Sequence, residues 1–370
     1  MKRLQTFKFP IDSRVIAISD IHGRFDILDE LLNKVNYIKG KDILVLMGDY
    51  SQKGKYPLKT LRYIMNLSSI NNVYCLLGNC DHGNYKIFNL EYLNNEFKDL
   101  LSIETSLLYD MKEEYYNNNS QKKDITLEEL QKDIEKEFEH ELNFLKNLPL
   151  MLETDDFLFV HAGVDKIKDY HNSLYRSVFM LKYFYYQGHL VDKMVVCGHF
   201  PVTIYRNEFN DNILFDFDRK IISIDGGMTV KAGGELNALI IEKNSSGYIY
   251  NQISCNGLVQ KTLLNDSIGL YRGKGPCWPN FKLKVLEEGI YFSKILLEEI
   301  NEITYIKNEY LDINKTKAKD DCPASILSVS KGETVGIVDD TCKGYVLVKY
   351  QGKQGWIKKE LIEGEQNEES

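Results

Sequence analysis

Six polar residues each follow a short apolar run, and their side chains are of the kinds that bind divalent metal ions. They are two aspartates, three histidines and an asparagine: Asp20, His22, Asp49, Asn79, His161 and His199. Carboxylate, imidazole and amide-oxygen ligands together suit ions such as manganese, iron or zinc. One carboxylate could bridge two ions, and two ions about 3.5–4 Å apart would activate a water and hold phosphoryl oxygens for in-line attack. The pattern therefore indicates metal-dependent phosphoryl chemistry.

The apolar runs before these residues predict buried strands. They read RVIAIS, DILVLM, NVYCLL, FLFV, MVVC and IISI, and LNALII is predicted to be the last strand of this region. Apolar residues at helical spacing follow the first run over 25–35, and YPLKTLRYIMNL predicts a second helix. Alternating strands and helices are typical of a mostly parallel sheet. In such a sheet, sites form at the carboxyl ends of the strands, where these polar residues lie.

Residues 101–150 have a different pattern, which predicts a helical cap. The stretch DITLEELQKDIEKEFEHELNFL is expected to form one helix, with Thr126 and Glu129 spaced as a capping box. Its apolar residues form a single stripe, so the helix should pack on the body of the protein. His140 in this helix is expected to be a surface or packing residue.

Beyond about residue 252, short apolar runs alternate with glycine, asparagine and lysine, which predicts small all-β structure. GYVLVKYQGKQGWIKKEL resembles the strands of a bacterial SH3-like barrel, and YIKNEYL is a weaker echo of WIKKELI 51 residues earlier. We therefore predict two SH3-like modules, over 253–313 and 314–363, and a disordered acidic tail over 364–370.

Composition restricts the possible classes of protein. The chain has 370 residues, a net charge of −8 and no block of lysine and arginine, so a nucleic-acid partner is not expected. It shows neither the apolar core of a signal peptide nor a membrane-spanning run, which predicts a cytoplasmic protein with no membrane partner. Seven cysteines without a CxxC pair indicate reduced thiols.

The order of the motifs resembles that of the calcineurin-like metallophosphoesterases. Over roughly residues 12–243 the matching segments read DIHG, GDYSQKG, GNCD, LPLMLETDDFLFVHAGV, VVCGHFP and ISIDGG. The nearest branch is the bacterial phosphoprotein (Ser/Thr) phosphatase group, which includes the symmetrical diadenosine tetraphosphate hydrolases. The resemblance implies an α/β fold, a four-layer α/β/β/α sandwich over residues 1–252. It also implies two metal ions, one held by Asp20, His22 and Asp49 and the other by Asp49, Asn79, His161 and His199.

Three positions depart from the family pattern. The usual GDxxDRG reads GDYSQKG, and the usual GNHE or GNHD reads GNCD, so Gln52 and Cys80 replace the aspartate and histidine that protonate the leaving group. Lys53 replaces the arginine that clamps phosphate, which keeps the charge and loses the bidentate fork. SLYRSVF resembles the family's LWxR segment, so Arg176 is the expected second phosphate contact.

Loss of the acid pair should change the preferred substrate. General acid catalysis is typically worth about 10²–10⁴-fold, and an alkyl phosphate with a poor leaving group needs it most. Small bacterial phosphodiesterases of the same superfamily also carry GNCD, but they usually end in GHTH where this chain reads GHFP. His82 is a candidate replacement acid, although a surface-loop histidine is the alternative interpretation. Cys80 is not expected to be a nucleophile, because no phosphate loop ending in arginine follows it.

These observations predict a two-metal phosphoesterase, with manganese favoured and iron or zinc as alternatives. Its expected substrate is a phosphorylated small molecule, a nucleotide or a phosphoprotein, and anhydride, aryl or diester phosphates are expected to react better than phosphoserine. The alternative is a weakly active or inactive metal-binding scaffold that binds a protein partner, for which the SH3-like modules are a second candidate surface.

Overall fold

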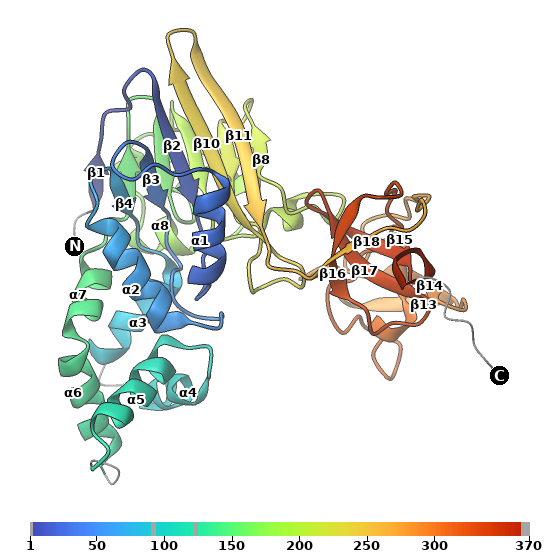
Figure 1. The fold of residues 1–370 in the computed structure, drawn as a ribbon, viewed down its shortest axis with the longest axis horizontal. Coiled ribbons are helices and arrows are strands. Elements are labelled where there is room, and N and C mark those ends of the chain that lie inside the picture. Colours follow the sequence, from blue (N-terminus) through green and yellow to red (C-terminus); the bar gives the residue numbers. More distant parts are fainter. Residues whose placement is uncertain (1–2, 90–93, 122–124, 364–370) are drawn as a thin grey trace. The chain divides into compact units, whose positions relative to one another are not determined.

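The computed structural model describes residues 3–89, 94–121 and 125–363, which form two compact units (Figure 1). The first unit comprises Met1–Pro201, Ile213–Thr229 and Leu236–Cys255. The second comprises Val202–Asn212, Val230–Glu235 and Asn256–Ser370. Among the described residues, none of the helices has both the length and the apolar character needed to cross a membrane.

The first unit is built on two sheets. A five-stranded sheet has the order β11-β10-β2-β3-β4, and a six-stranded sheet has the order β1-β5-β6-β7-β9-β8. The strands are β1 (Leu4–Thr6), β2 (Ser13–Ile18), β3 (Ile43–Leu46), β4 (Val73–Cys75), β5 (Met151–Glu153), β6 (Phe157–Val160), β7 (Met194–Cys197), β8 (Leu214–Asp216), β9 (Ile221–Ser223), β10 (Leu236–Asn244) and β11 (Gly247–Cys255). Strands β2, β3 and β4 run parallel, as do β6, β7 and β9.

Alternation along the strands separates two cores. Val15, Val45 and Phe159 belong to one apolar core, to which both sheets contribute. Ile16 and Leu44, which are next to Val15 and Val45 in the sequence, belong to a second core. Side chains of consecutive strand residues point to opposite faces, so each sheet is covered on both sides. The second core contains buried side chains of the flanking helices. The predicted α/β sandwich, followed by a separate all-β region, is confirmed by these layers and by the sheets of the second unit.

The helices of the first unit are short. They are α1 (Phe25–Lys34), α2 (Pro57–Ser68), α3 (Asn79–Lys86), α4 (Asn94–Ser102), α5 (Leu107–Asn118), α6 (Leu127–Glu137), α7 (Glu139–Asn147), α8 (Tyr175–Met180) and α9 (Phe184–Gln187). The predicted helices after DIHG and at YPLKTLRYIMNL are α1 and α2. Arg62 of α2 binds Glu114 of α5 and Glu141 of α7, with N–O distances of 2.7–2.8 Å, and so ties the cap helices to the body.

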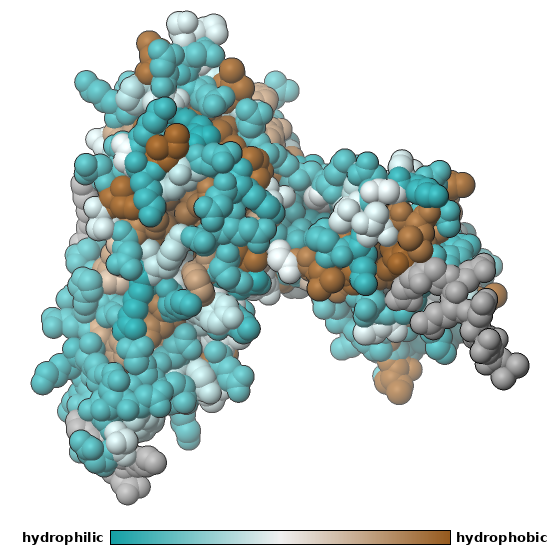
Figure 2. Space-filling model, viewed as in Figure 1, coloured by the Kyte–Doolittle hydropathy of each residue, from teal (hydrophilic) through white to brown (hydrophobic). Residues whose placement is uncertain are grey.

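The single helix predicted in the cap is divided into α6 and α7. Phe138 lies between them with φ −104° and ψ 25°, and this residue is 1% exposed. The capping box of Thr126 and Glu129 is present. The stripe does pack inward: Leu130, Ile134 and Leu145 join the core of the first unit. The surface of the cap seen in Figure 2 is accordingly mostly hydrophilic.

Glu153, at the end of β5, should make stability depend on pH. Burial alone would raise its pKa, but hydrogen bonds from Lys193, Tyr170 and His171 lower it to about 2. A carboxylate with a lowered folded-state pKa stabilises the protein above its unfolded pKa of about 4.5, and this contribution is lost as the pH falls toward 2. The shift corresponds to about 3 kcal/mol.

Urea unfolding of wild type and Glu153→Gln between pH 6 and pH 3 measures this contribution. The difference in unfolding free energy should be largest at pH 6 and should shrink steadily as the pH falls below 4.5. A difference that stays constant over this range would contradict the assignment of the shift to Glu153.

The second unit is all-β apart from short helical turns. Its strands are β12 (Gln260–Thr262), β13 (Leu283–Glu287), β14 (Phe292–Leu297), β15 (Glu302–Lys307), β16 (Thr334–Asp339), β17 (Tyr345–Tyr350) and β18 (Lys353–Lys358), and α10 (Glu360–Glu363) follows. They form antiparallel sheets of order β13-β14-β15 and β12-β16-β17-β18. Trp356 shares one buried cluster with Ile295 and Ile306, so both predicted SH3-like modules contribute to a common core. The assignment as SH3-like modules stays a prediction.

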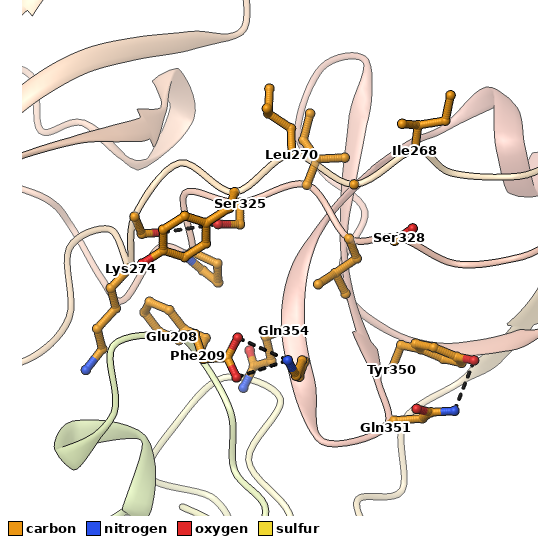
Figure 3. A pocket seen from close by; sticks show the side chains of 17 residues that line it. Glu208, Phe209, Ile268, Leu270, Lys274, Ser325, Ser328, Tyr350, Gln351 and Gln354 are labelled. Carbon is orange, nitrogen blue, oxygen red and sulfur yellow. Dashed lines mark hydrogen bonds and ion pairs between the residues drawn. The ribbon is translucent and has the colours of Figure 1, made fainter.

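Two internal features organise the second unit. Lys349 is buried and contacts Asp211 at 2.7 Å and Glu235 at 3.1 Å, which fixes the two shorter segments of the unit to its sheet. A cavity of about 570 Å³ opens between the 268–274 and 323–328 segments and the β17–β18 turn (Figure 3). Phe209 and Leu270 line it, and the Glu208–Lys353 ion pair lies at its edge.

Candidate functional site

The structure brings the six sequence-predicted metal ligands together at the carboxyl ends of strands from both sheets. Asp20 and His22 follow β2, Asp49 follows β3, and Asn79 begins α3 just after β4. His161 follows β6 and His199 follows β7. These strands are parallel neighbours within their sheets, so their ends converge on one region.

The carboxylate of Asp49 lies at the centre of the cluster. Its Oδ2 lies 3.8 Å from His22 Nε2, and its Oδ1 lies 3.5 Å from His161 Nε2. His161 Nε2 also lies 3.1 Å from Asn79 Oδ1. Two groups of three buried residues offer possible metal ligands, and within each group the donor atoms lie within 4.8 Å of one another. One group is His22, Asp49 and Cys80, and the other is Asp20, Asp49 and His161. Asp49 belongs to both groups, which is the position that a bridging ligand requires.

Four of the six candidate ligands have a left-handed backbone. The φ angles are +56° at Asp20, +46° at His22, +55° at Asp49 and +67° at His199. Such angles are uncommon outside glycine and cost on the order of 1–3 kcal/mol each, and they concentrate at functional sites. Each of these residues turns the chain sharply at a strand end, which directs its side chain into the cluster.

Two glycines allow the close packing of these loops. A Cβ at Gly78 would lie 2.2 Å from Asp49 Oδ1, and a Cβ at Gly198 would lie 2.4 Å from Asp20 Oδ2. The backbone amides next to them use this space. Cys80 N–H donates to Asp49 Oδ1 at 2.9 Å, and His199 N–H donates to Asp20 Oδ2 at 2.9 Å. Both carboxylates are therefore fixed in orientation.

Burial and charge set the protonation of the cluster. Burial lowers the pKa of His22 and of His199 to about 3, so both imidazoles are uncharged at neutral pH, the form that binds metal ions. Burial alone would raise the pKa of Asp49, but His161, His22 and Lys53 hold it below its usual range. The ionised carboxylate of Asp49 thus lies beside the neutral imidazole of His22, whereas Asp49 and Asp20 raise the pKa of His161 although its burial works to lower it.

Asp81 is a supporting residue that the sequence reading did not single out, although it belongs to GNCD. Its carboxylate accepts backbone N–H bonds from Asp49 at 2.7 Å, Tyr50 at 3.0 Å and Gly78 at 3.1 Å. It therefore joins the loop after β3 to the loop after β4, which carry Asp49 and Asn79. The signal in the sequence is the position of Asp81, three residues after Gly78 at the start of a helix, where an acidic side chain often accepts backbone N–H bonds.

The Asp81→Asn variant should lose both stability and metal affinity. The amide keeps one acceptor oxygen and places an N–H₂ group against backbone donors, so at least one hydrogen bond is lost and a buried donor is left unsatisfied, at a cost of about 1–3 kcal/mol. Misplacing the ligand loops should weaken metal binding by roughly 10–100-fold. Urea unfolding and titration with metal ions measure the two effects. The exposed Asp99→Asn variant is the control, and equal behaviour of the two variants would contradict the role of Asp81.

Lys53 lies near the acidic side of the cluster. Partial burial works to lower its pKa, but Cys80, Asp49, Asp20 and Asp225 raise it overall, so its ammonium group is charged.

Asp225 follows β9 and was also not singled out in the sequence, although it ends an apolar strand as the other candidates do. It is 2% exposed and accepts the Gly227 N–H at 2.7 Å.

Gln52 and Cys80, where the resemblance predicts replacement of an acid pair, contact other groups. Gln52 Nε2 donates to Asn84 Oδ1, and Asn84 Nδ2 donates to the carbonyl and hydroxyl oxygens of Ser51, both at 3.2 Å. Cys80 is 9% exposed, and its Sγ accepts a hydrogen bond from Asn79 Nδ2 at 3.5 Å. Gln52 is therefore held in an amide network, and Cys80 lies among the candidate ligands.

The remaining two predicted residues lie in other surroundings. The His82 ring packs against Phe179, Tyr85 and Tyr175 at centroid distances of 4.6, 5.3 and 5.6 Å. Burial lowers the pKa of His82 to about 4, so it lacks the extra proton of an acid at neutral pH. Arg176 is exposed on α8. This helix contacts the loop that follows His161, because Ala162 N–H donates to the Val178 carbonyl oxygen at 3.0 Å. The acid role of His82 and the phosphate role of Arg176 stay predictions.

The cluster fits divalent metal ions. Its donors are carboxylate, imidazole and amide oxygen, as such ions prefer. His22 Nδ1 is buried and has no hydrogen-bond partner among the described residues. His22 Nε2 is too far from both carboxylates for a hydrogen bond, at 3.8 and 3.9 Å. A buried imidazole with unsatisfied nitrogens is costly without a further partner, and a metal ion would provide one.

Two curated relatives resemble part of the chain. The chain is 30% identical over 152 residues to a symmetrical bis(5'-nucleosyl)-tetraphosphatase from Vibrio campbellii, which covers 41% of this chain and 45% of that protein. It is 47% identical over 64 residues to the Hamiltonella defensa protein of the same name, which covers 17% and 22%. The matches thus span less than half the length of these curated relatives.

One solved structure that resembles the chain is a candidate diadenosine tetraphosphatase. It has 18% sequence identity and a TM-score of 0.44, and the match covers 70% of this chain and 100% of that chain. The model of the calcineurin-like phosphoesterase family matches residues 13–225, which include all six candidate ligands and more than half of the chain. The protein therefore belongs to the calcineurin-like phosphoesterase family.

Proposed function

We propose that the protein is a metal-dependent phosphoesterase that prefers phosphoanhydrides, aryl phosphates or phosphodiesters over alkyl phosphomonoesters. The observation that carries this proposal is the convergence of six candidate ligands around Asp49, in two donor groups that share its carboxylate. Members of the family bind divalent metals, and manganese is the predicted ion. Bound divalent ions would supply Lewis-acid activation of water and of phosphoryl oxygens.

The side chains of the chain itself define the rest of the chemistry. The six ligands would hold the ions, and the ammonium group of Lys53 would attract and orient the anionic substrate. Lys53 provides a point charge rather than a planar fork, so it places fewer geometric limits on the phosphate than arginine would. This property favours a site that accepts phosphates of different shape.

The preference among substrates follows from the contacts of Gln52. A side-chain amide cannot donate a proton as an acid, and Gln52 Nε2 is already bonded to Asn84. An alkoxide leaving group would depart without the help that is typically worth about 10²–10⁴-fold. A nucleotide or phenolate leaves more easily. The curated relatives are named for hydrolysis of bis-nucleosyl tetraphosphates, so dinucleoside polyphosphates are the first substrates to test.

A substrate panel tests the proposal. Purified full-length protein is assayed with manganese against diadenosine tetraphosphate, p-nitrophenyl phosphate, bis(p-nitrophenyl) phosphate and a phosphoserine peptide. Anhydride, aryl or diester substrates should react at least about 10²-fold faster than the peptide, matching the lower limit of the missing acid's effect. A phosphoserine peptide as the best substrate would contradict the preference. Metal binding with no turnover of any substrate would favour the scaffold alternative.

A further inference from the structure

Cys80 occupies a position that the chemistry of the proposed site does not otherwise explain. It stands where the family has an acid-pair histidine, yet its surroundings are those of a ligand. Cys80, His22 and Asp49 are all buried, and each offers a donor atom within 4.8 Å of the others. The group contains one sulfur, one imidazole nitrogen and one carboxylate oxygen.

The backbone and neighbouring side chains hold the thiol in this place. Cys80 N–H donates to Asp49 Oδ1 at 2.9 Å, which ties the residue to the shared carboxylate. Asn79 Nδ2 donates to Cys80 Sγ at 3.5 Å, so the sulfur already acts as an acceptor. Cys80 lies in the first turn of α3, so its backbone is held by the helix and the sulfur stays near His22 and Asp49.

The partner residue His22 supports a metal at this position independently. Its Nδ1 is buried without a hydrogen-bond partner among the residues that the structure describes. Its Nε2 lies 3.8 Å from Asp49 Oδ2 and 3.9 Å from Asp20 Oδ1, which is too long for a hydrogen bond. An imidazole that is 2% exposed and forms neither bond is expected to serve a bound cation.

We propose that Cys80 is a thiolate ligand of the ion held by His22 and Asp49, and that it makes this position select thiophilic metals. Metal binding would release the thiol proton to solvent and form the metal–sulfur bond. Thiolate ligands favour zinc, iron or cobalt, whereas the other group, Asp20, Asp49 and His161, offers only oxygen and nitrogen. The two positions therefore differ in metal preference, and the position with sulfur should bind zinc before manganese. This inference rests on the proposed metal site.

X-ray absorption of the zinc-loaded full-length wild type tests the proposal without any substitution. A zinc–sulfur shell at about 2.3 Å should appear beside nitrogen and oxygen ligands at about 2.0–2.1 Å. The cobalt-loaded protein should show a near-ultraviolet sulfur-to-cobalt charge-transfer band. Cys80→Ser and Cys80→Ala should remove both signals and weaken zinc binding by at least roughly 10-fold. Cys75→Ala, a buried cysteine of β4 outside both donor groups, is the matched control and should keep both signals.

The outcomes separate this inference from the proposed function. Bound zinc and cobalt with neither a sulfur shell nor a charge-transfer band would overturn the thiolate ligand and leave the metal site intact. Loss of both signals in Cys75→Ala together with their persistence in Cys80→Ser would also overturn it. Failure of wild type to bind any of the metals would overturn the proposed site itself, and this inference with it.

Discussion

The Asp49→Asn variant is expected to lose at least about 10³-fold in turnover of every phosphate substrate, which equals or exceeds the cost of removing one transition-state donor. Asp49 is the only residue that belongs to both donor groups found among the described residues. The substitution keeps the shape of the side chain and removes the negative charge that lies 3.5 Å from His161 and 3.8 Å from His22. Both metal positions should therefore weaken together.

Metal content and fold decide how this result is interpreted. The Asp49→Asn protein should contain less than one ion per chain under conditions that load wild type with two, while its circular dichroism stays unchanged. Asp99→Asn removes one exposed carboxylate from α4 and should retain activity and metal. Full turnover by Asp49→Asn would contradict the shared-ligand role, and loss of activity with two ions still bound would show that the charge acts on the substrate instead.

The sheet elements of the first unit could be predicted because their apolar runs are short, β-branched and bounded by polar residues. Strands β2, β3, β6 and β7 were predicted at their observed places. Sites in such sheets form at the carboxyl ends of the strands, and this rule also predicted that the six candidate ligands lie close together. Strands β1, β5, β8 and β11 were not predicted. The prediction that LNALII is the last strand of this region was wrong, because β11 follows it and pairs with β10 as an antiparallel edge strand.

Other features depend on contacts that one sequence does not reveal. Phe138 is buried and separates α6 from α7, although no glycine or proline marks this break in the sequence. Asp81 acts through the backbone amides of Asp49 and Tyr50, which only the folded loops bring near. The left-handed turns at Asp20 and Asp49 are likewise imposed by tertiary contacts, since neither residue type requires them.

The second unit shows the same limit at the level of domains. Alternation and turn residues predicted all-β structure, which the antiparallel sheets confirm. The shared cluster around Trp356 depends on which strands pack together, and the sequence echo between its two halves says nothing about that packing. The predicted division into two modules at residue 314 was drawn from this sequence echo alone, and residues on both sides of it belong to the same buried cluster.

Restoring the acid pair should give the largest gain of activity. The Gln52→Asp, Cys80→His double variant is expected to hydrolyse alkyl phosphomonoesters about 10²–10⁴-fold faster than wild type, the range typical of general acid catalysis. Gln52→Asp removes the amide that donates to Asn84 and supplies a carboxylate. That carboxylate can orient an imidazole at position 80 and stabilise its charged form, which then protonates the leaving alkoxide.

The ratio of two substrates isolates this effect from general changes in the site. A phosphoserine peptide needs the acid and p-nitrophenyl phosphate needs it little, so the ratio of their kcat/KM values should rise with the double variant. Each single variant should give a smaller rise, because an unpaired histidine is poorly oriented and an unpaired aspartate is ionised at neutral pH and has no proton to donate. Metal is supplied in excess, since the double variant also removes the Cys80 thiol. An unchanged ratio in a folded, metal-loaded double variant would mean that the absent acid pair does not set the substrate preference.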